Sequence, residues 1–109
     1  MKIAPNRLLK LFDEEVECKK TLGAIRSKKV FNRIKLLRMA MVLADLKNAP
    51  GHWEELSSDR KGQFSVRLDE PYRLIFIPAG DSDIYKDDGG FNWNKISEVE
   101  IVEIINYHD

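Results

Sequence analysis

The feature that most constrains the fold is a run rich in β-branched residues, Val99-Glu100-Ile101-Val102-Glu103-Ile104-Ile105. Such a run predicts a buried strand, because branched side chains pack well on a pleated surface. Asn106-Tyr107-His108-Asp109 follows directly, so a phenol and an imidazole come at the end of this strand. Both groups can take part in proton transfer. The alternative is that Tyr107 caps the core and His108 is a frayed terminal residue.

A second strong pattern predicts a β-hairpin upstream of that strand. Apolar and polar residues alternate over residues 63–69, which is typical of a strand with one covered face. Glu70-Pro71 predicts a tight connection, because proline fixes φ and cannot donate to a ladder. Residues 72–77 then read as the returning strand. Arg67 and Arg73 are therefore expected near the turn end of the hairpin.

The N-terminal half predicts a short edge strand at Met1–Ala4 followed by two helices. Apolar residues recur at helical spacing from Arg7 to Leu22, and Gly23 is expected to end this first helix. Ser27 is a suitable N-cap for a second helix through about Asp45. Its apolar stripe is expected to contain Val30, Ile34, Leu37 and Met41. The fold class predicted is α+β, with this strand and two helices packed on a small, mainly antiparallel sheet that cannot bury its apolar side alone.

Length and composition predict one domain spanning residues 1–109. The chain is 43% hydrophobic and 33% charged, which allows a single core without room for a second one. The longest uncharged apolar run, Met39–Ala44, is too short to cross a bilayer, and no signal peptide is recognisable. The lone Cys18 cannot form an internal disulfide, so we expect a reducing, cytoplasmic location. Cys18 itself is expected to pack as a small apolar residue.

Charge is distributed unevenly along a chain of zero net charge. Residues 1–50 hold 12 Lys or Arg and 5 Asp or Glu, a balance of +7, and residues 51–109 hold 6 and 13, a balance of −7. Zero net charge is unusual for a nucleic-acid-binding protein unless its cations cluster on one surface. Arg26, Lys29 and Arg33 are expected on one face of the second helix. This face would contact RNA phosphates, bind an acidic partner or simply be solvated.

The segment Ala79–Lys95 reads as a loop rich in Asp and Gly. Its acidic residues lack the twelve-residue pattern and terminal Glu of a calcium loop, so no metal site is expected there. Phe91 and Trp93 are expected to fold back as a small apolar cluster. Trp53 is likewise expected to pack rather than to stack on a base.

Four groups of residues together resemble a family of bacterial toxins. They are Leu46–Gly51, then Leu56 with Asp59-Arg60-x-Gly62-Gln63-x-Ser65-Val66-Arg67, then Tyr72-Arg73-Leu74-x-Phe76, and finally Val99-x-Ile101-x-Glu103-Ile104-x-x-Tyr107-His108. The pattern is similar to the RelE/ParE superfamily, and specifically to its HigB-like branch. The resemblance implies the toxin component of a type II toxin–antitoxin system that cuts mRNA on the ribosome.

The resemblance also implies roles for residues and partners. Cleavage needs a base at the 2′-hydroxyl, cations on the phosphorane and an acid at the 5′-oxygen. Arg67 and Arg73 are expected to stabilise the phosphorane, because a guanidinium matches phosphate oxygens in pairs. Arg60 and Lys61 would contact phosphate, His108 would transfer protons, and Tyr107 would orient it or stack on a base. No cofactor or metal is implied. The partners implied are the ribosome, mRNA and a helix-turn-helix antitoxin, in a possible heterotetramer.

Two positions depart from the family pattern, and alternatives remain open. Asn106 stands where many relatives carry Asp, and Glu54 stands where many carry His. Glu54 could itself be the base if its pKa were raised or an arginine lay nearby, or His52 could substitute if the loop allowed it. Arg67 and Arg73 could instead pair with Asp69 or Glu103. The alternative functions are a ParE-like gyrase inhibitor and an inactive binding protein of the same fold, and an antitoxin is expected to dock on the basic helix face.

Overall fold

Five strands form one sheet in the computed structural model, which describes residues 1–80, 84 and 90–107. The order across the sheet is β1-β5-β4-β3-β2, so the long strand β5 lies between β1 and β4. β1 runs parallel to β5, and the other neighbours are antiparallel. The strands are β1 Lys2–Ile3, β2 Glu54–Glu55, β3 Phe64–Arg67, β4 Tyr72–Pro78 and β5 Glu98–Asn106.

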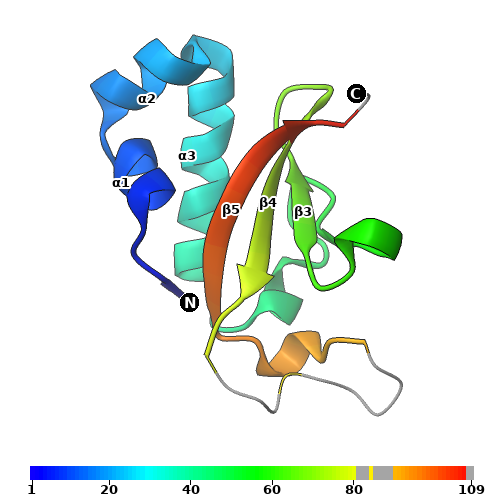
Figure 1. Ribbon diagram of the computed structural model, residues 1–109. Coiled ribbons are helices and arrows are strands. Elements are labelled where there is room, and N and C mark those ends of the chain that lie inside the picture. The colour runs from blue at the N-terminus through cyan, green and yellow to red at the C-terminus, as the bar shows by residue number, and fades with distance from the viewer. Residues whose placement is uncertain (81–83, 85–89, 108–109) are drawn as a thin grey trace.

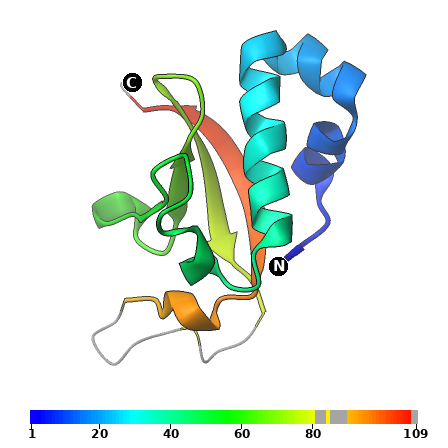
Figure 2. The same cartoon turned by 180° about the vertical axis from the view of Figure 1, so that it is seen from behind.

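Three helices pack as a layer on one face of this sheet (Figures 1 and 2). They are α1 Arg7–Asp13, α2 Glu15–Leu22 and α3 Ala24–Met39. Short 3₁₀ turns follow at Leu43–Leu46, Ser58–Arg60 and Trp93–Lys95. The predicted α+β class is therefore confirmed, with a mixed sheet that is antiparallel except at its β1 edge.

The predicted hairpin is present as β3 and β4. Phe64 pairs with Phe76 and Arg67 pairs directly with Arg73, so both arginines lie at the turn end. The expectation that only one face of β3 is covered is wrong, because Ser65 has no exposed surface. The opposite face of the sheet is thus partly filled rather than open to water.

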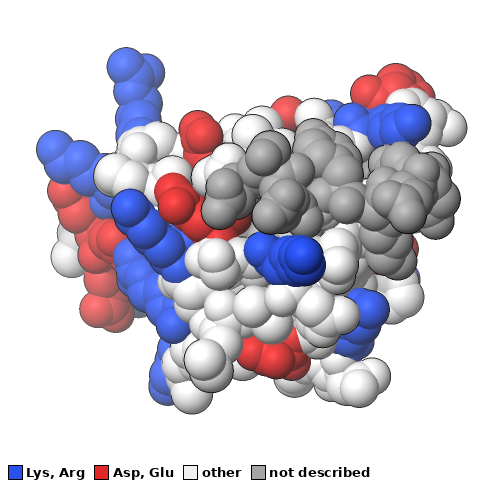
Figure 3. All heavy atoms as spheres, turned by 90° about the horizontal axis from the view of Figure 1, so that it is seen from below, with Lys and Arg blue, Asp and Glu red and all other residues white. Residues whose placement is uncertain are grey.

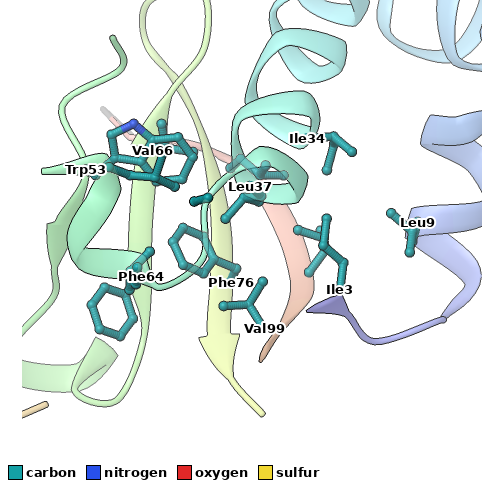
Figure 4. Close-up of a cluster of buried hydrophobic side chains, with 14 of the residues drawn as sticks. Ile3, Leu9, Ile34, Leu37, Trp53, Phe64, Val66, Phe76 and Val99 are labelled. Carbon is teal, nitrogen blue, oxygen red and sulfur yellow. The ribbon is translucent and has the colours of Figure 1, made fainter. Parts of the chain in front are cut away.

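The core lies between α3 and the sheet (Figure 4). Leu37 from α3 packs toward Phe76 and Val99, while Trp53 covers the β3 end beside Val66. All five side chains are buried. Burial of a large apolar side chain stabilises a fold by about 1.5–3 kcal/mol, so this cluster fixes the position of the hairpin on the helix layer.

The predicted first helix is interrupted, which corrects one expectation. Glu14 adopts an extended conformation (φ −98, ψ 96) between α1 and α2. Phe12 and Cys18 are both buried. On one straight helix they would point about 120° apart, since successive residues turn by about 100°. The break at Glu14 lets both side chains face the core.

The second helix differs from prediction at both ends. Gly23 (φ 85) reverses the chain and α3 begins at Ala24, so Ser27 is not an N-cap. Ser27 instead lies inside the helix, where its hydroxyl donates to the Ala24 carbonyl at 3.2 Å. The helix ends at Met39 rather than near Asp45. Met41 therefore leaves the apolar stripe and is 81% exposed.

The segment after β4 contributes to the core where it is described. Phe91 is buried against Phe64, with ring centres 5.2 Å apart, and Trp93 meets the same ring edge-on at 5.1 Å. The expected apolar cluster is confirmed. Residues 81–83 and 85–89, which include the acidic run, lie outside the described residues. None of the described helices is long and apolar enough to span a membrane.

Candidate active site

The face of the sheet opposite the helices carries the candidate site. Phe64, Val66 and Leu74 point to the helix layer, so the residues alternating with them point to this second face. Strand pairing arranges these residues in two adjacent rows. The first row is Glu54, Ser65, Ile75 and Glu103, and the second is Arg67, Arg73 and Ile105.

A groove of about 710 Å³ opens beside these rows, and Glu54 and Ile105 are the row residues that line it. Residues 54–60 from β2 and the following turn line one side, and residues 105–107 at the end of β5 line the other. The groove therefore brings together two segments that are some fifty residues apart in sequence. Its lining is mainly polar, with Glu54, Glu55, Asp59, Arg60, Asn106 and Tyr107 among the residues.

Arg73 is the most constrained charged group of the site. Its side chain is 10% exposed, and its Nη1 lies 3.5 Å from Glu54 Oε1. Its guanidinium carbon lies 4.1 Å from the centre of the Tyr107 ring, within the range of a cation–π contact. The Nε atom is buried and has no hydrogen-bond partner among the described residues. A buried donor without a partner is costly, and an anionic oxygen would satisfy it.

Glu54 lies at the junction of three side chains. Its Oε1 is 3.5 Å from both Arg73 Nη1 and the Ser65 hydroxyl, and its Oε2 is 3.2 Å from His52 Nε2. The Glu54 side chain remains 36% exposed. An ionised carboxylate accepts only, so Glu54 has room to accept a proton from a group bound in the groove. The sequence expectation that Glu54 needs an arginine nearby is met by Arg73.

The remaining cations of the hairpin lie at the margins of the site. Arg60 donates to Gln63 Oε1 at 2.8 Å and lies 3.6 Å from Glu103 Oε2. Lys61 is exposed at the next position. Arg67 is 45% exposed and 3.8 Å from Glu70. Positive charge at the rim is therefore largely balanced by carboxylates.

Two alternatives considered from the sequence are wrong. Arg67 and Arg73 do not pair with Asp69 or Glu103. Asp69 instead forms an ion pair with Arg26 of α3, and Glu103 forms one with Arg60. Tyr107 does not cap the core, since it is 45% exposed. Its backbone N–H donates to the Pro71 carbonyl at 3.0 Å, which fixes the end of β5 beside the hairpin turn.

The basic face expected on α3 does not form as predicted. Arg33 is 6% exposed, and its Nε donates to the Arg67 carbonyl at 2.8 Å. Burial lowers the pKa of the Arg33 guanidinium. Arg26 makes a two-pronged ion pair with Asp69, at 3.0 and 3.1 Å, and stacks on Tyr72 at 3.4 Å from the ring centre. The expected surface location of Arg33 is thus wrong.

Lysines rather than arginines make up the exposed charge of this face. Lys28, Lys29 and Lys35 are all exposed on α3. Viewed from below, Lys and Arg side chains gather toward the helix side of the molecule and are interleaved there with Asp and Glu (Figure 3). The two arginines instead tie α3 to the hairpin, Arg26 through the Asp69 carboxylate and Arg33 through the Arg67 carbonyl.

His108 lies outside the described residues. Trp53 is buried and donates to the Pro50 carbonyl at 3.0 Å, as expected for a packing residue. No group of three or more His, Cys, Asp or Glu in the described part of the chain is placed to hold a metal ion. Ser65 was missed by the sequence reasoning, because its polar side chain in an alternating strand resembles a solvent-facing residue.

The α+β fold is that of a solved structure described as a YoeB/ParE toxin. The chain is similar to the solved YoeB/ParE toxin from Agrobacterium tumefaciens, with 17% identity, a TM-score of 0.55, and coverage of 95% of this chain and 96% of that one. A YoeB dimer from Staphylococcus aureus also matches, with 17% identity, a TM-score of 0.48, and coverage of 94% and 88%. Because the second score is the lower, we base the fold on the first. No protein-family model and no curated sequence matches the chain.

Proposed function

We propose that this protein is the toxin of a type II toxin–antitoxin system and cleaves mRNA on the ribosome. Its motifs are similar to those of the HigB-like branch, and we propose that residues 1–109 act as one toxin unit in the cytoplasm. The observation that carries the proposal is Arg73: a buried guanidinium beside the groove, in contact with Tyr107 and Glu54 of its lining, with its Nε unpartnered. Such a group is a ready phosphate ligand in a site that also holds a proton acceptor.

The proposed reaction transfers the phosphodiester within the RNA strand. Glu54 takes the proton of the 2′-hydroxyl, and the 2′-oxygen attacks phosphorus. Arg73 stabilises the extra negative charge of the phosphorane, with Arg67 as the second cation. His108 donates a proton to the departing 5′-oxygen. The products are a 2′,3′-cyclic phosphate and a 5′-hydroxyl end, and all protons are accounted for.

Binding of RNA is proposed to use the aromatic and basic side chains around the groove. Tyr107 is exposed at the groove end, and a base can stack on its ring. Arg60 and Lys61 would contact phosphates at the opposite side, and Lys29 would extend the contact along α3. Arg26 and Arg33 are better suited to holding the hairpin, since both are engaged with it.

We further propose a helix-turn-helix antitoxin that neutralises the toxin, in a possible heterotetramer. The exposed lysines of α3 support docking on that helix, because they are available to an acidic partner. Charge reversal at Lys28 and Lys29 should weaken the complex with the antitoxin. An unchanged complex would place the antitoxin elsewhere on the toxin.

A second candidate is a binding protein without nuclease activity. It is favoured by the carboxylates of the groove, since Glu54, Glu55 and Asp59 line it and the one arginine of that lining is Arg60. An RNA phosphate would be repelled by such a lining unless Arg73 attracts it more strongly. The two candidates differ in whether expression of the protein harms the cell.

Induced expression in bacteria tests the proposal. Wild type should arrest growth, and Arg73→Lys, Glu54→Gln and His108→Ala should each relieve the arrest. Arg7→Ala, at an exposed arginine of α1 far from the groove in sequence, is the matched control and should remain toxic. Arrest with intact mRNA would point to a ParE-like gyrase inhibitor. Growth unaffected by wild type would favour the binding protein.

A further inference from the structure

We infer that His52 is a positioning and proton-relay residue that connects Glu54 to solvent. The inference rests on the proposed function, because it assigns Glu54 a proton to lose after each cleavage. Its basis is the contact of 3.2 Å between His52 Nε2 and Glu54 Oε2. Only Trp53, which is buried, separates the two residues in sequence.

Glu54 lies between the groove and His52. One carboxylate oxygen faces Arg73 from β4 and Ser65 from β3, and the other faces the imidazole. The Glu54 side chain is 36% exposed and His52 is 57% exposed. Glu54 lines the groove, whereas His52 does not. A proton accepted inside the groove therefore has a direct outlet to water through the imidazole.

The loop that carries His52 is held firmly in an uncommon conformation. His52 has φ 52, in the left-handed region that non-glycine residues seldom adopt. The preceding Gly51 accepts a hydrogen bond from the Arg67 N–H at 2.7 Å, and Trp53 is buried just after it. These anchors fix the backbone on both sides of His52. They aim its imidazole at Glu54 without any need for movement.

Stability does not explain this arrangement. An exposed imidazole–carboxylate pair contributes little to stability, and a non-glycine residue in the left-handed region costs more. Glycine would suit the backbone at position 52 better than histidine. Strain of this kind clusters where a side chain has a task. The task that the geometry offers is exchange of a proton with Glu54.

The relay moves one proton from Glu54 to water. After cleavage Glu54 carries the proton of the 2′-hydroxyl. The neutral imidazole with its hydrogen on Nδ1 takes that proton at Nε2 and becomes an imidazolium. It then releases the Nδ1 proton to water, which leaves Nε2–H donating to the ionised Glu54. One proton leaves the carboxyl group and one reaches solvent. Exchange with water restores the first tautomer.

The test uses two substitutions that tolerate the left-handed backbone. His52→Asn keeps a polar side chain that cannot relay a proton, and His52→Gly leaves a space of imidazole size. Purified proteins are assayed on a single-stranded RNA and on ribosomes programmed with mRNA, across a range of pH. Thermal unfolding verifies that each variant is folded. Glu54→Gln serves as the reference for complete loss of the base.

We expect His52→Asn to lower kcat by roughly tenfold to a hundredfold, with KM unchanged. This loss does not exceed the smallest rate contribution typical of direct acid–base catalysis, which is about a hundredfold. Its pH–rate profile should change shape, and added imidazole should restore part of the activity of His52→Gly. A merely structural role would move neither readout.

Wild-type kcat and pH profile in His52→Asn would overturn the inference. So would a loss in His52→Gly that imidazole does not restore, with an unchanged pH profile. If wild type cleaves RNA and Glu54→Gln does not, while both His52 variants behave as wild type, only the relay fails. If wild type cleaves neither substrate, the proposed function fails, and the relay with it.

Discussion

Gly51 is the position where a single methyl group should do most damage to the site. Its φ is +117, a conformation that side chains rarely adopt. A Cβ there would lie 2.5 Å from Val66 Cγ2 and 2.8 Å from Arg33 Nε. Both neighbours are buried, and Arg33 is tied to the Arg67 carbonyl, so neither can move aside freely. Gly51→Ala is therefore both strained and overpacked.

The cost can be separated into two parts with a matched control. The backbone strain is worth about 1–3 kcal/mol, and the overpacking about another 1–3 kcal/mol. Gly62 has a similar φ of +94, but a Cβ there would meet nothing within 4 Å. Gly62→Ala should therefore cost only the strain. We expect Gly51→Ala to lower the free energy of unfolding by about 3–5 kcal/mol, out of the roughly 5–15 kcal/mol typical of a domain.

Urea unfolding followed by tryptophan fluorescence and circular dichroism measures both variants. The midpoint for Gly51→Ala should fall well below that for Gly62→Ala, while the slope stays the same for each. In a thermal scan the difference of about 2 kcal/mol corresponds to roughly 8–16 °C for a chain of this size. Equal losses in the two variants would refute the close packing of Val66 and Arg33 on Gly51.

Two further predictions concern the helix layer. Arg26 and Asp69 should show a coupling of about 1 kcal/mol in a double-mutant cycle with Arg26→Leu and Asp69→Asn, because the pair is two-pronged and half-buried. A coupling of zero would show that the pair does not hold the hairpin turn. Burial raises the pKa of the Cys18 thiol. The stability that this provides is complete below the pKa of the unfolded thiol and is lost as pH rises through the folded value. Urea midpoints between about pH 7 and 10 should fall less steeply in Cys18→Ala than in wild type, and parallel curves would contradict this.

Most of the fold could be predicted from local sequence patterns. The alternation over residues 63–69, the Glu70-Pro71 connection and the β-branched run at 99–105 depend on neighbours in sequence, and all three gave the observed strands. The break at Glu14 and the start of α3 at Ala24 depend on how helices pack on one another. Periodicity within one segment holds no information on that packing.

The sequence identified several residues of the candidate site but not how they are arranged. The sequence placed Arg67 and Arg73 at the hairpin turn, as the strand register confirms. The stacking of Arg73 on Tyr107 and the contact of Glu54 with Arg73 join residues from β4, β2 and the turn after β5, and they follow only from the order of strands in the sheet. The burial of Arg33 was hidden for the same reason, since its partner, the Arg67 carbonyl, belongs to another layer.

Mapping of RNA 5′ ends after induced expression tests most directly whether the groove cleaves RNA. We predict new 5′-hydroxyl ends within mRNA in cells that express wild type, and their absence with Glu54→Gln, which preserves the size of the side chain. Arg7→Ala should give the wild-type pattern. The same ends in wild type and Glu54→Gln, or intact mRNA in cells arrested by wild type, would contradict cleavage by this site.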